Sequence, residues 1–248
     1  MRRSPWASRR AKARPPKEPA GPDASGLAVA IDTASDLAGV ALTEDGALLA
    51  SLTWRTRRNH SRELLPALDW LLAQQGRSKE EVGAVFVCLG PGSYAGLRVG
   101  VSTAKALAFA LDAALAGVGR LAADAEPIVA AAQGRVVAVH AAGRAELAWA
   151  VYEGGPEGPR EVIAPRLGPL DALVEVLAAG DRLCAEGATL AQLAPLAERT
   201  GAVLVEAVPG RVLAVARLGH ARLARGEVDN PDTLVPLYLR APAIGPQR

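Results

Sequence analysis

Short apolar runs and longer helical patterns alternate along most of this chain. Leu27–Ile31 is wholly apolar and ends at Asp32, which is typical of a buried central strand. Two β-rich runs follow, Gly39–Thr43 and Ala47–Trp54, and the Asp-Gly pair between them predicts a hairpin turn. The folded part of the chain is therefore predicted to open with three short strands in a row.

Two long helices are predicted next. Leucines at helical spacing indicate the first helix. Ser61 can cap it, Pro66 is tolerated near its start, and Gly76 ends it. The second runs from Tyr94 to Leu111 after a glycine-rich loop. The other elements predicted in this half are strands Val82–Leu89 and Ala116–Val118 and a helix over Leu121–Ala132.

The second half of the chain repeats this order in a weaker form. Because three strands, a helix, a strand and a helix occur twice, we predict an α/β fold of two lobes that face one another, each a mixed sheet flanked by helices. The N-terminal lobe is predicted over residues 27–133 and the C-terminal lobe over residues 134–248, with a tail from Asp229 that packs back on the body. The predicted strands are Val136–His140, Leu147–Tyr152, Glu161–Ala164, Arg182–Ala185 and Ala202–Glu206, and the helices are Pro169–Ala179, Leu190–Arg199 and Val212–Arg225.

Charge sets the N-terminus apart from the rest. Residues 1–26 carry a net charge of +5 and the whole chain +2, which leaves −3 for the remainder. The segment has no apolar stretch of the secretory type, and we predict a disordered basic extension, with an RNA-binding arm as the alternative. The mildly acidic remainder has no general nucleic-acid signature. No apolar run reaches the ~18 residues of a membrane span, so a cytoplasmic location without membrane contact is expected.

Neither cysteine nor histidine placement indicates a metal site or a disulfide. Cys88 and Cys184 lie far apart in apolar surroundings and are predicted to be buried free thiols. The three histidines, His60, His140 and His220, are equally scattered. With no nucleophile elbow and no carboxylate pair, we predict no catalytic residue, no metal and no cofactor.

Two loops have the composition of phosphate-binding turns. One follows the first strand, where an Asx or ST turn is the simpler interpretation. The other precedes the helix from Tyr94, where glycines and a helix N-terminus can bind an anion, although a Walker lysine and a dinucleotide spacing are missing. The candidate residues of this phosphate-loop-like pair are Asp32, Thr33, Ser35, Gly90, Gly92 and Ser93.

Small residues recur every four positions along the second helix. Gly96, Gly100, Ala104 and Ala108 fall on one face and allow another element to approach closely. Packing within the same chain is the commoner explanation of such a face, and contact with a second chain is the alternative.

Three segments together resemble the TsaB family, also called YeaZ. They are Leu27–Ser35, His60–Pro66 and Gly90–Gly100, and their order and spacing agree with that family as well as their residues do. Pro236–Arg240 is similar to the family's usual ending. The resemblance covers Leu27 to Arg240 and implies the two-lobed fold of the sugar-kinase/actin-like (ASKHA) group.

The resemblance also implies a function. TsaB proteins belong to the bacterial machinery that forms threonylcarbamoyladenosine next to the tRNA anticodon, as the non-catalytic partner of the TsaD subunit. A TsaE-type ATPase joins them, tRNA is reached through the complex, and a homodimer is expected when TsaD is absent. Arg120 and Asp124 stand where TsaD has its two metal-binding histidines. A guanidinium does not ligate a metal, so an inactive paralogue is expected.

The resemblance places the partner surface on the helices predicted over Ser61–Gln75 and Tyr94–Leu111. An active small-molecule kinase or a peptidase-like enzyme of the same fold is the alternative, and it needs a second phosphate loop, for which Glu186–Thr189 is a poor candidate. The predicted contact residues are Leu64, Leu68, Gly100, Val101, Ala104, Lys105 and Ala108.

Overall fold

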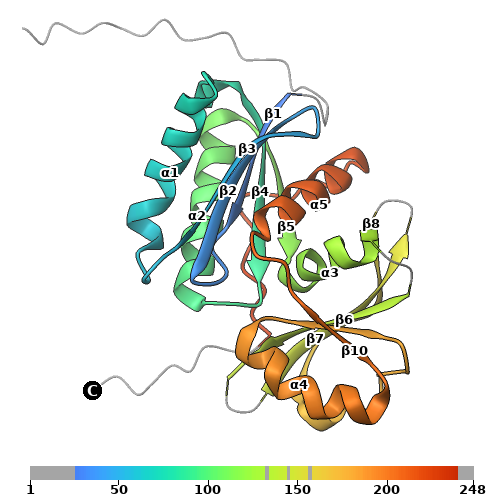
Figure 1. The fold of residues 1–248 in the computed structure, drawn as a ribbon. Coiled ribbons are helices and arrows are strands. Elements are labelled where there is room, and N and C mark those ends of the chain that lie inside the picture. Colours follow the sequence, from blue (N-terminus) through green and yellow to red (C-terminus); the bar gives the residue numbers. More distant parts are fainter. Residues whose placement is uncertain (1–25, 132–133, 144–145, 156–157, 240–248) are drawn as a thin grey trace, which may run out of the picture.

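The chain folds into two lobes, each built around one five-stranded mixed sheet (Figure 1). The computed structural model describes residues 26–131, 134–143, 146–155 and 158–239, so the predicted basic extension lies outside the described residues apart from Gly26. The first sheet has the order β3-β2-β1-β4-β5, with strands β1 Leu27–Asp32, β2 Leu37–Glu44, β3 Ala47–Arg55, β4 Val82–Gly90 and β5 Ala114–Gly119. The second has the order β10-β9-β6-β7-β8, with strands β6 Arg135–Ala141, β7 Glu146–Gly155, β8 Gly158–Pro169, β9 Arg182–Ala185 and β10 Val203–Glu206.

Both sheets have the same connectivity. Three antiparallel strands come first, and the next two strands run parallel to the first of them. The β2–β3 hairpin turns at Asp45 and Gly46, whose φ angles of 51° and 80° suit a tight turn. The predicted repeat of an α/β order in two lobes is therefore confirmed.

Three helices cover the outer faces of the sheets. Helices α1 (His60–Gln74) and α2 (Tyr94–Leu111) lie on the first sheet, and α4 (Gly187–Thr200) lies on the second (Figure 1). Helix α1 buries leucines at helical spacing, as predicted, but it begins at His60, and Ser61 lies inside its first turn instead of capping it. Among the described residues, no helix is both long and apolar enough to cross a membrane.

The last helix of each half packs on the sheet of the other half. Helix α3 (Arg120–Ala131) follows the first sheet, yet its Leu121 and Ala125 pack in the core of the second lobe. Helix α5 (Val212–Ala224) ends the second half and lies on the first sheet, where Gly219 sits directly over Phe86. Figure 1 shows both helices between the two sheets. A boundary after residue 133 therefore separates the two halves of the sequence, but each half contributes one helix to the packing of the other half's lobe.

One predicted helix is wrong. The segment Pro169–Ala179 forms only the 3₁₀ turn η2 (Leu170–Leu173) and further turns. Strand β8 stays extended through Pro169, and the carboxylate of Asp181 accepts a hydrogen bond from the backbone N–H of Ala178 at 2.8 Å, which closes a turn before β9. The apolar spacing comes from residues such as Leu173 that fill the core without a continuous helix. The other short 3₁₀ turn, η1, spans Lys79–Glu81.

The tail returns to the first lobe, as predicted. The backbone N–H of Asp229 donates to the carbonyl of Leu115 at 2.7 Å, and the N–H of Leu237 donates to the carbonyl of Leu89 at 2.8 Å. Further along the tail, the ring of Tyr238 lies 5.1 Å from the ring of Tyr94 at the start of α2. The tail therefore covers the edge of the first sheet next to α2, as far as the described residues extend.

Candidate functional site

The two phosphate-loop-like turns meet at the end of β1. The Asp32 carboxylate accepts a hydrogen bond from the N–H of Ala34 at 2.9 Å, which makes the turn an Asx turn. The N–H of Ser93 donates to the carbonyl of Ala34 at 2.8 Å and joins the two turns. The Thr33 hydroxyl donates to the carbonyl of Gly96 in α2 at 2.8 Å. Ser35 hydrogen-bonds Leu37 within its own turn, and Gly90 has a φ of 101°.

Gly92, just before α2, and Gly96 and Gly100 within it face this turn in the same chain. A Cβ atom on Gly92 would lie 2.2 Å from the carbonyl oxygen of Ala34, and one on Gly96 would lie 2.2 Å from that of Thr33. A Cβ on Gly100 would lie 2.2 Å from the Thr33 hydroxyl. For Gly96 and Gly100, the close approach is therefore made within the same chain.

Replacing Gly96 with alanine is expected to lower the free energy of unfolding by about 1–3 kcal/mol, because the new methyl group meets backbone atoms that cannot move aside. This loss outweighs the ~1 kcal/mol by which alanine favours a helix over glycine. Gly119→Ala, at the end of β5, is the control for a glycine replaced without a steric contact, since its Cβ meets nothing within 4 Å. Urea denaturation of the two variants measures the difference, and equal stability would contradict the close contact.

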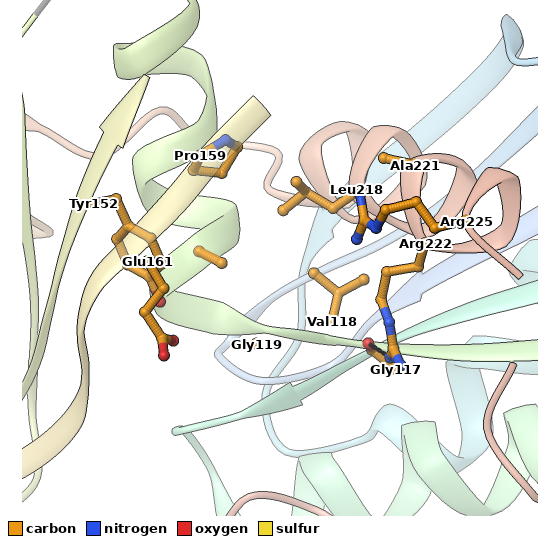
Figure 2. A pocket seen from close by; sticks show the side chains of 11 residues that line it. Gly117, Val118, Gly119, Tyr152, Pro159, Glu161, Leu218, Ala221, Arg222 and Arg225 are labelled. Carbon is orange, nitrogen blue, oxygen red and sulfur yellow. Dashed lines mark hydrogen bonds between the residues drawn. The ribbon is translucent and has the colours of Figure 1, made fainter. Parts of the chain in front are cut away.

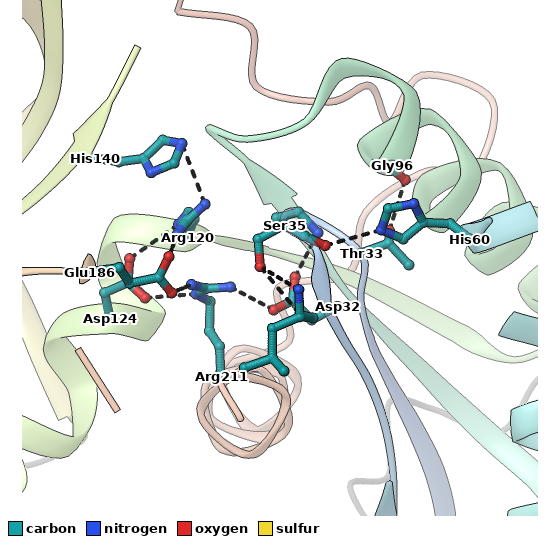
Figure 3. A network of polar contacts seen from close by, with 12 residues as sticks. Asp32, Thr33, Ser35, His60, Gly96, Arg120, Asp124, His140, Glu186 and Arg211 are labelled. Atoms are coloured by element: carbon teal, nitrogen blue, oxygen red, sulfur yellow. Dashed lines mark hydrogen bonds and ion pairs between the residues drawn. The ribbon is translucent and has the colours of Figure 1, made fainter. Parts of the chain in front are cut away.

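A cluster of charges, buried except for the 40% exposed side chain of Glu186, joins the two lobes beside this turn, and Figure 3 shows it. The side chain of Arg211, at the N-terminus of α5, reaches Asp32 at 2.8 Å, Asp124 at 2.6 Å and also Glu186. Arg120 contacts the same Asp124 at 3.3 Å and Glu186 at 2.5 Å. We refer to these five residues as the interlobe ion network.

The network uses carboxylates from both halves of the chain. Asp32 ends β1 and Asp124 lies in α3, whereas Glu186 lies between β9 and α4. Burial alone would lower the pKa of Arg211, but Asp32 and Asp124 outweigh it and raise that pKa above its ordinary value. Arg211 therefore stays charged and compensates carboxylates that would be costly to bury without a cation.

His140 lies at the edge of the network. Its Nε2 is 3.4 Å from a guanidinium nitrogen of Arg120, which can only donate, so this ring nitrogen accepts and the imidazole is neutral. Burial, with the nearby Arg120 charge, lowers the pKa of His140 to about 3.

The network occupies the position at which the candidate turn would hold a ligand. One Asp32 oxygen is bonded to the Ala34 N–H and the other to Arg211. Arg120 and Asp124, which the resemblance aligns with the metal-binding histidines of TsaD, are bound to each other. Within the described ranges, no three His, Cys, Asp or Glu side chains gather as they would around a metal ion.

Sequence reasoning missed Arg211 entirely and noted Glu186 only as part of a poor loop. The position of Arg211 just before a predicted helix was one signal in the sequence. A cation at a helix N-terminus opposes the helix dipole and therefore calls for a carboxylate partner. The two cysteines, Cys88 and Cys184, are buried free thiols as predicted. Burial raises the pKa of both thiols, and the carboxylates of the network add to the effect.

Most of the predicted partner-contact residues are buried within this chain. Leu64, Leu68, Val101, Ala104 and Ala108 are all at most 3% exposed, because they pack between the helices and the first sheet. Gly100 is buried against Thr33, and Lys105 donates to the carbonyl of Leu234 in the tail at 3.1 Å. Among them, Leu64 lines the groove between α1 and α2 and Lys105 is partly exposed, while the others contribute little to the surface of these helices.

An open groove runs between α1 and α2. It has a volume of about 360 Å³, and Leu64 is part of its lining. Leu65 in the groove is 47% exposed, and Phe109 further along α2 is 84% exposed. The remaining lining residues are Ser61, Arg98, Val99, Ser102 and Thr103.

A second hollow lies between α5 and the β7–β8 hairpin (Figure 2). Its volume is about 200 Å³, and Tyr152, Glu161, Arg222 and Arg225 point towards it. Arg222 is bound to Asp229 at 2.8 Å, and Arg225 is bound to Glu227 at 2.6 Å. With both cations paired to carboxylates, this hollow is not an anion site.

Comparison with known proteins gives a family and two partial relatives. A family model described as "TsaD: tRNA N6-adenosine threonylcarbamoyltransferase" matches residues 54–206, more than half of the chain. The Bacillus subtilis "tRNA threonylcarbamoyladenosine biosynthesis protein TsaB" is 36% identical over 93 residues, which are 38% of this chain and 41% of that protein. The Escherichia coli protein of the same name is 32% identical over 138 residues, 52% of this chain and 56% of that protein. The chain thus spans about half the length of the curated relatives it matches.

One solved structure is similar across both lobes. YeaZ from Pseudomonas aeruginosa matches with a TM-score of 0.70 and 25% identity, covering 86% of this chain and 100% of that one. This likeness confirms the predicted two-lobed sugar-kinase/actin-like fold.

Proposed function

Because this chain belongs to the tRNA N6-adenosine threonylcarbamoyltransferase family, and within it to the TsaB/YeaZ group, we propose that it is the non-catalytic subunit that holds a TsaD-type catalytic subunit. The pair forms threonylcarbamoyladenosine next to the tRNA anticodon in the cytoplasm, and a TsaE-type ATPase joins it. Without TsaD, two copies of this chain pair through the same helices.

The observation that supports the non-catalytic role is the contact between Arg211 and Asp32. An Asp at this turn could act on a metal-bound phosphate only with a free carboxylate, and here both oxygens are bonded within the chain. Glu186, in the loop that would have to supply the second phosphate turn, is bound to Arg120 and Arg211. An active enzyme of this fold would keep the carboxylates of Asp32 and Glu186 free. In this chain the interlobe ion network uses them for contacts between the lobes.

The surface that fits a partner helix is the groove between α1 and α2. Leu65 in its lining and Phe109 further along α2 are exposed apolar side chains, and side chains of this kind at the centre of an interface supply most of its binding energy. Leu65 and Phe109 therefore replace the buried leucines and small residues as the proposed contacts.

Replacing Leu65 with aspartate is expected to weaken co-purification with a cognate TsaD at least about tenfold, because a charge enters an apolar contact. Formation of the modified nucleoside should fall with it. Val208→Asp is the matched control, since Val208 is 53% exposed in a loop of the second lobe. Unchanged TsaD binding by the Leu65 variant would refute this surface.

The decisive test of the role is a modification assay with and without the wild-type chain. A one-to-one complex that TsaD needs for activity supports the proposal, and full activity without the chain overturns it. A dissociation constant for ATP below about 1 mM for the isolated chain would instead favour the kinase-type alternative.

A further inference from the structure

Four arginines crowd the connection from β3 to α1. Arg55, Arg57, Arg58 and Arg62 are all exposed, and none of them forms an ion pair with a described residue. The acidic residue in the same stretch, Glu63, accepts a hydrogen bond from the Trp54 indole N–H at 2.9 Å, so its carboxylate is engaged elsewhere. We refer to these four residues as the arginine turn.

The backbone of the arginine turn is held in place from within the first lobe. Thr56 is buried, its N–H donates to the carbonyl of Asp36 at 2.7 Å, and its hydroxyl accepts from the N–H of Asn59 at 3.0 Å. The ring of His60 donates to the carbonyl of Ser35 at 3.0 Å (Figure 3). The arginines are thus presented from a fixed frame, which lowers the entropy cost of binding.

The charge of this turn contrasts with that of the other residues from 27 onward. Residues from 27 onward carry a net charge of −3 with the arginine turn included. Asp36, on the adjacent loop, is exposed but forms no ion pair with the four arginines. A polyanion would therefore be attracted to this turn and repelled by much of the remaining surface.

The chemistry of the turn fits a phosphate backbone better than a protein. A guanidinium group can bind two phosphate oxygens at once. Positive charge of this kind is the main requirement for a surface that binds a nucleic-acid backbone. A protein partner needs an apolar centre, whereas the residues between these arginines are Thr56, Asn59, His60 and Ser61, of which Thr56 and His60 are buried. Ser61 also borders the α1–α2 groove opposite Arg98, an exposed fifth cation.

We propose that the arginine turn binds the phosphate backbone of RNA. The identity of that RNA as the tRNA to be modified rests on the proposed function. The turn lies at the N-terminal end of α1, beside the groove that we assign to TsaD, so RNA bound there would lie next to the catalytic subunit.

The test compares two triple variants of the full chain, each of which loses three positive charges. Arg55→Ala/Arg57→Ala/Arg62→Ala removes most of the turn, and Lys79→Ala/Arg160→Ala/Arg199→Ala removes exposed cations elsewhere. Fluorescence anisotropy with unmodified tRNA at several salt concentrations gives the affinity. We expect a loss of about 10–100-fold for the first triple at low salt, with a salt slope reduced by about 2–3, and a loss below about threefold for the second.

Equal losses in both triples, or no loss in the first, would overturn the proposal. A first triple that keeps its tRNA affinity but loses TsaD would make the turn a protein-docking surface and overturn it as well. These affinities are measured without TsaD, so they stay separate from the co-purification that decides the proposed function.

Discussion

Replacing Arg211 with alanine is expected to remove about 3–5 kcal/mol from the free energy of unfolding, because three carboxylates lose a shared buried cation. A domain is stable by only about 5–15 kcal/mol, so the variant should unfold at a much lower urea concentration. Urea denaturation followed by circular dichroism measures the shift.

Arg217→Ala is the matched control for this experiment. Arg217 lies on the same helix and pairs with Glu126 at 2.5 Å, but its side chain is 53% exposed. Exposed pairs contribute little, so we expect a loss below about 1 kcal/mol. If the Arg211 variant is too unstable to purify, Arg211→Lys keeps one charge and should give an intermediate loss. An Arg211 variant as stable as the Arg217 variant would mean that the network does not hold the lobes together.

Acidification is expected to destabilise the protein through His140, by about 1.4 kcal/mol for each pH unit below about 6.5. The folded pKa of about 3 lies below the unfolded value of about 6.5, so the unfolded chain binds the extra proton. The contribution of His140 is therefore complete above pH 6.5 and is lost as the pH falls towards 3. The cause is first the partial burial of the imidazole and second the Arg120 guanidinium, which an imidazolium would face.

His140→Gln isolates this effect, since the glutamine oxygen can accept from Arg120 but does not titrate. Denaturation of both proteins between pH 7.5 and 5 gives two stability curves, and their difference should have a slope of about one proton. The network carboxylates are common to both proteins and cancel in the comparison. Parallel curves would show that His140 does not carry the expected pH dependence.

Local sequence patterns predicted most of the secondary structure. The helix from Tyr94 to Leu111 has the predicted bounds, and the Asp45-Gly46 turn closes the predicted hairpin. These features depend on neighbouring residues, whose spacing can be followed along the sequence. The predicted helix over Pro169–Ala179 is wrong, because the apolar residues in this segment fill the core without forming a continuous helix.

The site depended on contacts that no local pattern contains. Asp32 and Arg211 are 179 positions apart, and nothing near either residue indicates the other. Leu64 and Leu68 were predicted to contact a partner, but a leucine on an amphipathic helix packs on its own sheet when that sheet is present. The turn with Asp32 could be found by composition, whereas the position of Arg211 at a helix N-terminus calls for a carboxylate partner without indicating which one.

The crossing of α3 and α5 has a consequence for how the protein is made on the ribosome. The face of the first sheet that carries Ala28, Ala30 and Phe86 is covered by α5, which is translated after every strand of both sheets. The first lobe therefore emerges with this face open, and it stays open until translation has passed Ala224. During that interval the nascent chain exposes apolar surface of the kind that chaperones bind. The second lobe, with α3, α4 and strands β6–β10, is fully translated by Glu206, whereas native packing of the first lobe must wait for α5.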